Sequence, residues 1–385
     1  RNLLLVGVDS RRYAVARQAS DGPFGRSQCV DSDLHVSGED IEIRKRMMME
    51  ARLSEINNQK SNITNLYGCD KSQKSEPMRV AVLRGGVGRE REVSLESGRC
   101  VAEALRQGGV DVVTSDIRPD DMAILARKDI DVFFLALHGE FGEDGQLQQV
   151  FEDRGLVYTG CGPEASRLAF DKMASKRLFA AGGVAVPSVV EFAPGDDSAG
   201  LDGQLKKFGE RFVVKPIRQG SSVGVHVVKS RSEAVAAACQ VRDEFGDCMV
   251  ESFITGREVT VGVLDRQPLP IIEIRSKTGF YDYQAKYIDD RTEYLFDTIE
   301  DETVRTRIAE AAMTCFDALG CRDFSRIDFI VSEDGTPYAL EANTIPGFTT
   351  HSLLPKAAAK LGIPMSELCV RIVRTTAAKR QGKKV

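Results

Sequence analysis

From Met78 onward, strand-like and helix-like runs alternate, and this alternation restricts the fold more than any other feature. The runs RVAVL, VDVVTSDI and IDVFFLALHG are strand-like, and FFLAL has the unbroken apolar character of a buried parallel strand. Between the first two runs, residues 93–107 place apolar side chains at helical spacing and end at a Gly-Gly pair. This βαβ pattern predicts an α/β unit with a parallel sheet.

The middle and end of the chain have a different texture. A helix is expected over 165–181. Strands are expected at 212–215, VGVHVVK, MVESFI, EVTVGVL and LPIIEIR, the last two antiparallel. Helices are expected over 231–245, 303–319 and 365–379. Strand–loop–helix units on smaller sheets predict an α+β arrangement rather than a second Rossmann-like domain.

The segment 325–347, SRIDFIVSEDGTPYALEANTIPG, reads as two strands joined by a tight turn at Asp334-Gly335. With that turn, Asp328 lies opposite Glu341, and Asn343 shares the face of Glu341 because side chains alternate along a strand. Two carboxylates and an amide oxygen suit Mg²⁺, which also takes substrate phosphates as ligands. The alternative is an edge hairpin with a solvated acidic face.

Nucleotide binding, if present, uses neither common glycine motif. The loop after the first strand lacks GxGxxG because Arg91 replaces the last glycine, and the GxxxxGK[ST] pattern is absent. Instead, Lys215 ends a strand and is followed by Gly220-Ser221-Ser222-Val223-Gly224, where small residues let backbone N–H groups approach a phosphate. Together with the hairpin carboxylates, this loop indicates ATP chemistry.

Two further features keep alternative interpretations. Glu90 stands at a helix start, where the helix dipole favours acids, so a structural and a functional role are both open. The segment YDYQAKY is polar, aromatic and irregular; its tyrosines are either packing anchors or part of a substrate lid with a phosphate-seeking lysine.

Composition excludes several classes. A net charge of −5 argues against a broad nucleic-acid surface, and no apolar run approaches the roughly 20 residues of a membrane span. Nine cysteines without CxxC pairs argue for reduced thiols in a cytosol, and four histidines make a multi-histidine metal site improbable. We therefore expect a cytoplasmic protein with neither a nucleic-acid nor a membrane partner.

Residues 1–77 differ from the remainder. RNLLLVGV reads as one short strand without a partner, IEIRKRMMMEARLSEI as a helix, and the stretch before Met78 as a polar linker. The chain begins at Arg1 and lacks the apolar core of a signal peptide. We expect an upstream extension that is poorly ordered or not part of the natural product; the alternative is an accessory segment of unknown role.

The motifs GREREVSLESG, LALHGEFGEDG, YTGCG, DKMASK, VVKP…QGSSVGV, YDYQAKY, SRIDFI and EANTIPGFTTHSL occur in this order. Over about residues 78–378 the chain thus resembles the D-alanine–D-alanine ligases of the ATP-grasp superfamily. The resemblance implies a Rossmann-like (preATP-grasp) domain over 78–171 and a two-subdomain ATP-grasp fold. The central subdomain would cover 172–256, the C-terminal catalytic subdomain 257–378 and a tail 379–385, with 1–77 outside.

The resemblance also implies residue roles, which fall into four groups. ATP would be bound by Lys172, Lys215, Ser222, Glu251, Glu258 and Lys286. The metal ligands would be Asp328, Glu341 and Asn343. Catalytic groups would be Glu90, Ser221, Tyr287, Arg326 and the backbone N–H of Gly347, and Ser221 and Tyr287 would form a hydrogen-bonded group with Glu90 at the second amino acid. The two amino acids would contact Glu90, His138, Ser352 and Leu353. The sequence departs from the family pattern at Val87-Gly88, Gln219 and Ser252, and these departures bear on substrate affinity more than on the reaction.

The implied reaction joins two D-alanines through a D-alanyl phosphate, with ATP as substrate and two Mg²⁺ or Mn²⁺ ions, for peptidoglycan precursors. Homodimerisation is the family expectation. The nearest alternative is a D-alanine–D-lactate or D-alanine–D-serine ligase, although Tyr287 favours an amine nucleophile. A non-catalytic nucleotide-binding regulator and another ATP-grasp carboxylate–amine ligase are more distant alternatives.

Overall fold

The computed structural model describes residues 6–7, 13–14, 78–276 and 292–381. The chain divides into two compact units, Arg1–Ser75 and Glu76–Val385. In the first unit, β1 (Val6–Gly7) pairs antiparallel with β2 (Tyr13–Ala14). The expectation of a strand without a partner was therefore wrong, while the helix expected in IEIRKRMMMEARLSEI lies outside the described residues.

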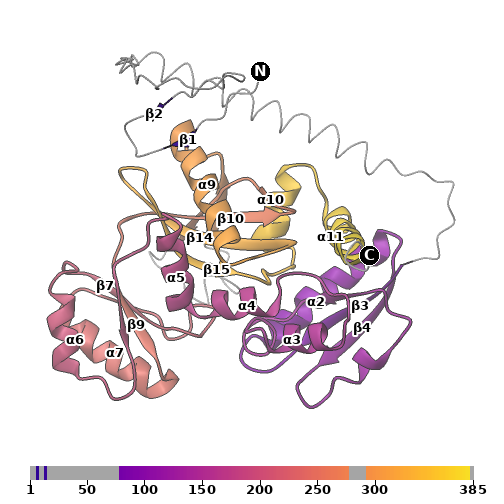
Figure 1. The fold of residues 1–385 in the computed structure, drawn as a ribbon, viewed down its shortest axis with the longest axis horizontal. Coiled ribbons are helices and arrows are strands. Elements are labelled where there is room, and N and C mark those ends of the chain that lie inside the picture. The colour runs from indigo at the N-terminus through magenta and orange to yellow at the C-terminus, as the bar shows by residue number, and fades with distance from the viewer. Residues whose placement is uncertain (1–5, 8–12, 15–77, 277–291, 382–385) are drawn as a thin grey trace, which may run out of the picture. The chain divides into compact units, whose positions relative to one another are not determined.

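The second unit begins with the predicted parallel sheet (Figure 1). Its order is β4-β3-β5, and both pairings are parallel. The strands are β3 (Arg79–Gly85), β4 (Asp111–Ile117) and β5 (Val132–Leu135). Helix α2 (Arg91–Gln107) connects β3 to β4, which confirms the βαβ prediction. Two shorter helices after β4, η1 (Ala123–Ala126) and α3 (Gln146–Asp153), were not predicted.

A second sheet is antiparallel and has the order β6-β9-β7-β8. Helices α6 and α7 pack on it through a shared apolar core. The elements are β6 (Val189–Phe192), α6 (Ser198–Leu205), β7 (Phe212–Pro216), β8 (His226–Val228), α7 (Arg231–Phe245) and β9 (Cys248–Ser252).

The third sheet is also antiparallel, with the order β13-β12-β10-β14-β15 and β11 paired to β10. Helix α9 packs against β10, β14 and β15. The elements are β10 (Gly256–Leu264), β11 (Gln267–Pro268), β12 (Ile272–Ser276), β13 (Thr292–Phe296), α9 (Glu302–Ala318), β14 (Phe324–Ser332) and β15 (Pro337–Asn343). Two antiparallel sheets with helices match the α+β prediction.

The helix expected over 165–181 is two helices, α4 (Pro163–Phe170) and α5 (Lys172–Ala181). Asp171 separates them because its backbone is extended, with φ −85° and ψ 98°. Its carboxylate accepts a hydrogen bond from the Ala174 N–H, a typical N-cap interaction. The break turns the first residue of α5, Lys172, toward a cavity described below.

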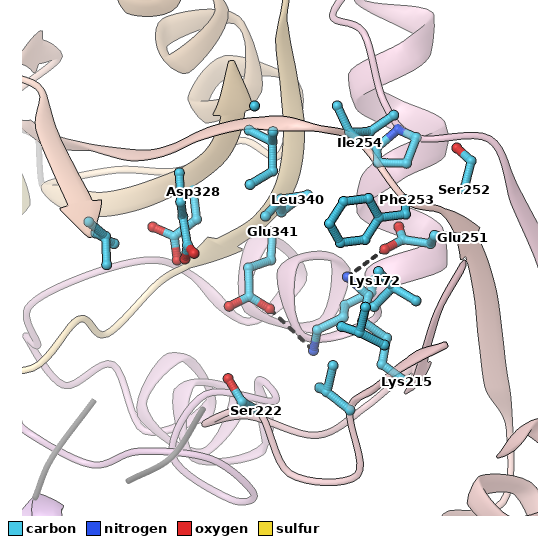
Figure 2. A pocket seen from close by; sticks show the side chains of 18 of the residues that line it. Lys172, Lys215, Ser222, Glu251, Ser252, Phe253, Ile254, Asp328, Leu340 and Glu341 are labelled. Atoms are coloured by element: carbon cyan, nitrogen blue, oxygen red, sulfur yellow. Dashed lines mark ion pairs between the residues drawn. The ribbon is translucent and has the colours of Figure 1, made fainter. Parts of the chain in front are cut away.

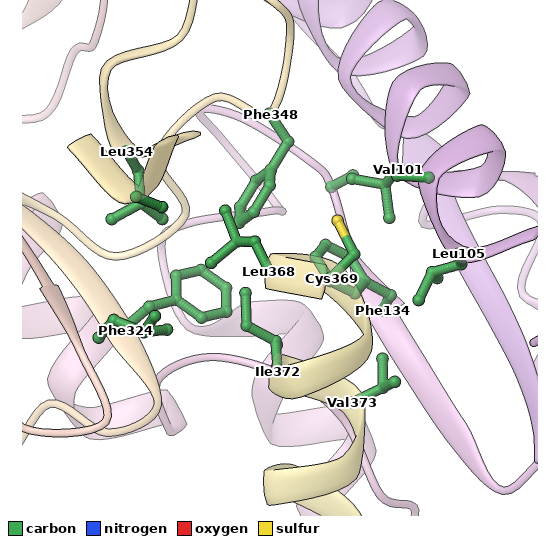
Figure 3. Close-up of a cluster of buried hydrophobic side chains, with 14 of the residues drawn as sticks. Val101, Leu105, Phe134, Phe324, Phe348, Leu354, Leu368, Cys369, Ile372 and Val373 are labelled. Atoms are coloured by element: carbon green, nitrogen blue, oxygen red, sulfur yellow. The ribbon is translucent and has the colours of Figure 1, made fainter. Parts of the chain in front are cut away.

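The C-terminal helices pack against elements from the start of the second unit. Helices α10 (Leu353–Lys360) and α11 (Met365–Gln381) pack against each other, and α11 packs against α2 and β5. Figure 3 shows the shared core, whose labelled side chains are all buried: Val101, Leu105, Phe134, Phe324, Phe348, Leu354, Leu368, Cys369, Ile372 and Val373. One continuous core therefore joins segments from both ends of the second unit.

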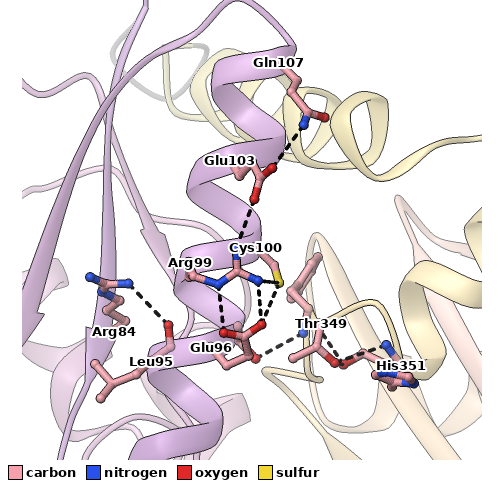
Figure 4. Close-up of polar contacts among 12 residues, drawn as sticks. Arg84, Leu95, Glu96, Arg99, Cys100, Glu103, Gln107, Thr349 and His351 are labelled. Atoms are coloured by element: carbon pink, nitrogen blue, oxygen red, sulfur yellow. Dashed lines mark hydrogen bonds and ion pairs between the residues drawn. The ribbon is translucent and has the colours of Figure 1, made fainter.

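The outer face of α2 carries charged side chains instead (Figure 4). Arg99 pairs with Glu96 at 2.7 Å and with Glu103 at 3.1 Å, at helical spacings of three and four residues. Such exposed pairs contribute little to stability, so packing of the buried face positions this helix. In the described ranges, none of the helices has the length and apolar content needed to cross a membrane.

Candidate active site

A cavity of about 490 Å³ lies between the second and third sheets. Its walls come from α5, β7, β9, β10, β12, β14 and β15 (Figure 2). Five of the predicted ATP-binding residues line it: Lys172, Lys215, Ser222, Glu251 and Glu258. The sixth, Lys286, lies outside the described residues. Residues distant in sequence thus meet in one cavity of a size typical for a small ligand.

Two ammonium groups line this cavity. Lys172 Nζ lies 2.5 Å from the carbonyl oxygen of Gln219 and 3.6 Å from Glu341 Oε2. Lys215 Nζ lies 2.8 Å from Glu251 Oε2. Each lysine is only 8% exposed, so both charges are largely shielded from bulk water. Positive charge held this way suits an anionic group such as a phosphate.

A third lysine, Lys176, lies behind the cavity wall and was not predicted as a functional residue. Its Nζ is 2.6 Å from Glu251 Oε1, and it donates to the Ala339 carbonyl oxygen at 3.2 Å. Burial lowers the pKa of Lys176 to about 8, although Glu251 opposes this shift. Burial by itself raises the pKa of Glu251, but Lys176 and Lys215 outweigh it, so that pKa is lowered. The available sequence signal was the i, i+4 spacing of Lys172 and Lys176, which puts both on one helical face.

The predicted hairpin forms, and Asp328 pairs with Glu341 as expected. The connecting loop, however, has three residues, Glu333 to Gly335, because the Ser332 N–H donates to the Thr336 carbonyl. A register shift between Asp328 and Phe329 leaves Leu340 as an extra residue on β15. As a result, the consecutive residues Leu340 and Glu341 both line the cavity.

The three predicted metal ligands lie together on this hairpin. Asp328 is 6% exposed and receives hydrogen bonds from Arg326 at 2.9 and 2.8 Å, from Thr260 at 2.5 Å and from Asn343 at 3.1 Å. Glu341 projects into the same cavity beside Lys172 (Figure 2). Two carboxylates and an amide fit the oxygen donors that Mg²⁺ takes when a substrate phosphate completes its shell. Over the described ranges, no cluster of three or more His, Cys, Asp or Glu side chains suited to a metal occurs.

Glu90 lies at the N-cap of α2 and joins two loops. It accepts a short hydrogen bond from Ser221 Oγ. A Cβ added to Gly139 or to Gly220 would come closer than 3.0 Å to Glu90 Oε2, so the carboxylate fills the space left by two missing side chains. Ser221 itself has a left-handed backbone, φ 51°, a conformation that persists only where its surroundings hold it. A second cavity, of about 980 Å³, opens beside Glu90 and Gly220.

His138 is buried next to this carboxylate, and its tautomer follows from its partners. Nδ1 lies 3.0 Å from the Ile345 carbonyl oxygen, which can only accept, so Nδ1 carries the hydrogen. Nε2 therefore accepts from Ser97 Oγ at 3.0 Å. Burial lowers the pKa of His138, which keeps the ring neutral despite the nearby charge of Glu90.

Glu143 was also missed, although it lies in the motif LALHGEFGEDG. It accepts hydrogen bonds from the N–H groups of Gly139 at 2.8 Å and Ile345 at 3.2 Å. Burial, and then the charge of Glu90, raise the pKa of Glu143 to about 8. These two hydrogen bonds connect the loop after β5 to the segment after β15. The same segment supplies the Ile345 carbonyl oxygen to which His138 donates.

The segment after β15 carries the remaining predicted residues. A Cβ on Gly347 would lie 2.6 Å from Ser352 Oγ, so the two positions are in close contact. Ser352 Oγ accepts from the Thr349 N–H at 2.9 Å, and Ser352 is the N-cap of α10. The Leu353 side chain is buried in the core. Only its backbone N–H, at the start of α10, is therefore able to contact a ligand. Tyr287 lies outside the described residues.

Two family models match the chain: "D-ala D-ala ligase N-terminus" over residues 121–161 and "D-ala D-ala ligase C-terminus" over residues 178–374. The D-alanine–D-alanine ligase of Syntrophotalea carbinolica is 42% identical over 301 residues, covering 78% of this chain and 97% of the relative. The enzyme of the same name from Anaeromyxobacter sp. strain K is 44% identical with the same coverage.

The similar solved structures are also ligases of this family. The D-alanine–D-alanine ligase of Bacillus anthracis complexed with ATP is 32% identical, with a TM-score of 0.70 over 80% of this chain and 99% of that one. The VanG D-Ala:D-Ser ligase of Enterococcus faecalis is 28% identical, with a TM-score of 0.69 over 78% of this chain and all of that one (100%). The predicted fold class, a Rossmann-like domain followed by an ATP-grasp fold, is confirmed.

Proposed function

The chain belongs to the D-alanine–D-alanine ligase family, and on that premise we propose that it joins two D-alanines at the expense of ATP. One observation carries the proposal: the lysine-lined cavity and the Glu90 carboxylate meet at a single loop. In that loop, Ser222 lines the cavity and Ser221 binds Glu90. A phosphate donor and an amino acid are thereby brought to one place.

In the first step, the carboxylate of one D-alanine attacks the γ-phosphorus of ATP, the bond from that phosphorus to the bridging oxygen breaks, and D-alanyl phosphate and ADP are formed. Lys172 and Lys215 are the proposed phosphate contacts, and Lys286 is a further one expected from the sequence. Such a step depends on positioning and electrostatic stabilisation rather than on covalent chemistry by the protein. Asp328, Glu341 and Asn343 would hold Mg²⁺, which when bound offsets phosphate charge.

In the second step, the amine of another D-alanine attacks the acyl phosphate carbonyl, and phosphate leaves. Arg326 and the Gly347 N–H are the proposed donors to the tetrahedral oxyanion. Arg326 is held beside the proposed metal ligands by its two hydrogen bonds to Asp328. Glu90 would bind the first ammonium group beside the neutral His138, with Tyr287 completing the Ser221 hydrogen-bonded group.

The adenosine is proposed to contact Glu251 at the base and Glu258 at the ribose, since both carboxylates line the cavity. Ser352 and the Leu353 backbone are the proposed contacts of the second carboxylate. We further propose that the enzyme is a homodimer and that its dipeptide serves peptidoglycan precursors. Sedimentation or light scattering of the full chain tests the dimer.

The decisive experiment measures phosphate release and dipeptide formation by the full chain with ATP and Mg²⁺. D-Alanine should support turnover, whereas L-alanine or no amino acid should not. D-Serine, offered with D-alanine, tests the specificity named for the VanG match, and D-lactate tests the other alternative expected from the sequence. Chelation of divalent ions should stop turnover. A preparation that binds ATP but forms no dipeptide from D-alanine would refute the proposed function.

A further inference from the structure

Lys176 has no part in the reaction proposed above, yet its burial is extreme for a charged side chain. It is 1% exposed, and its ammonium group contacts Glu251 and the Ala339 carbonyl oxygen. Lysine is almost never fully buried unless it is paired. Lys176 therefore needs an explanation, and Glu251, at 2.6 Å, is its only ionic partner among the described residues.

Glu251 is shared by two lysines that differ in access to the cavity. Lys176 contacts Oε1 from behind the wall, and Lys215 contacts Oε2 from the cavity side. Glu251 and Lys215 line the cavity, whereas Lys176 does not. Lys215 can therefore leave the carboxylate and contact a ligand in the cavity. Lys176 could reach such a ligand only if helix α5, which carries it, moved.

This difference matters when a phosphate arrives. Glu251 is 2% exposed, and removing the sole partner of a buried charge is strongly unfavourable because an uncompensated charge remains. If Lys215 were the only cation at Glu251, binding a phosphate would leave that carboxylate unpaired. With Lys176 in place, Glu251 keeps one cation while Lys215 moves.

We propose that Lys176 is a positioning residue that holds Glu251 ionised and in place, so that Lys215 can transfer from Glu251 to a nucleotide phosphate. The inference rests on the proposed function, because it assumes that ATP occupies this cavity. According to this inference, Lys176 affects phosphate binding selectively although it does not contact the ligand. Adenosine, which has no phosphate, does not require the transfer.

The test compares the affinities of ATP and adenosine, measured by calorimetry on the full chain without D-alanine. In K176M, Lys215 should remain at Glu251 and keep that carboxylate in place for the base, so ATP affinity should fall about 10- to 100-fold while adenosine affinity changes less than about threefold. The matched control is K207M, which removes an exposed lysine and should leave both affinities unchanged. The proposal would be overturned if the ratio of ATP to adenosine affinity were the same in K176M and the wild-type protein, whether both affinities stayed constant or both fell in parallel.

A second comparison does not require K176M to fold. In E251Q the buried carboxylate that Lys176 compensates is absent. K176M/E251Q should therefore show the same ratio of ATP to adenosine affinity as E251Q. A further tenfold selective loss of ATP affinity in the double variant would refute the inference. Wild-type protein that fails to bind ATP would instead refute the proposed function, which keeps the two failures distinct.

Discussion

Replacing Gly139 with alanine should weaken binding of the first D-alanine, because the new Cβ would displace Glu90. Gly139 has φ +68°, and its added Cβ would approach Glu90 Oε2 closer than 3.0 Å. Gly155 offers a matched control: its φ is +62°, and its added Cβ would meet nothing within 4 Å. Both variants carry the left-handed backbone cost of about 1–2 kcal/mol, so their difference isolates the displacement of Glu90.

The size of the effect follows from the interaction at risk. A hydrogen bond to a charged group contributes about 1.5–3 kcal/mol, so losing the contact between Glu90 and an ammonium group should raise the half-saturating D-alanine concentration by about 10- to 150-fold. The measurement is phosphate release against D-alanine concentration at saturating ATP, together with the melting temperature. The ATP requirement should change little, since the lysines of the first cavity are untouched. Equal D-alanine dependence in G139A and G155A would refute the reasoning.

Three further predictions concern the hairpin, the core and pH. R326A should lower dipeptide formation by roughly 100- to 1,000-fold while ATP affinity changes little; unchanged turnover would remove Arg326 from the oxyanion site. F348A should reduce the free energy of unfolding by about 3–5 kcal/mol, since the ring is fully buried, whereas L361A, at a side chain 55% exposed, should cost less than about 0.5 kcal/mol. Burial raises the pKa of Glu273, but hydrogen bonds, first from Arg257, lower it to about 2. Its stabilising contribution should therefore be complete above about pH 5 and disappear as pH falls toward about 2, so the melting temperatures of wild type and E273Q should converge on acidification; a constant difference would contradict this.

Local pattern was sufficient for most elements in the second unit. Alternation of strand and helix predicted the parallel sheet, and helix 231–245 matches α7 at both ends because Ser230 caps it and Gly246 follows it. The break between α4 and α5 was missed because Asp171 interrupts an otherwise helical run. A single side-chain cap outweighed the apolar spacing there.

In the hairpin, the predicted pairing of Asp328 with Glu341 is correct although the predicted loop length and the predicted regular register are both wrong. The loop has one residue more than the predicted turn, and Leu340 is an extra residue on the opposite strand. The two shifts cancel, so Asp328 still pairs with Glu341. Sequence indicated which carboxylates meet, but the bulge that lets Leu340 and Glu341 face one cavity depends on packing against neighbouring strands.

By itself, the sequence determined most strands and helices of the second unit and the kinds of residue proposed to hold phosphate and metal, because these depend on periodicity and on side-chain chemistry within short segments. The contact of Ser221 with Glu90, 131 positions away, was implied only by the family resemblance, and only the tertiary structure revealed that Lys176 shares Glu251 with Lys215. Such contacts arise from how three sheets pack together, and no local periodicity encodes the distance between side chains on different sheets.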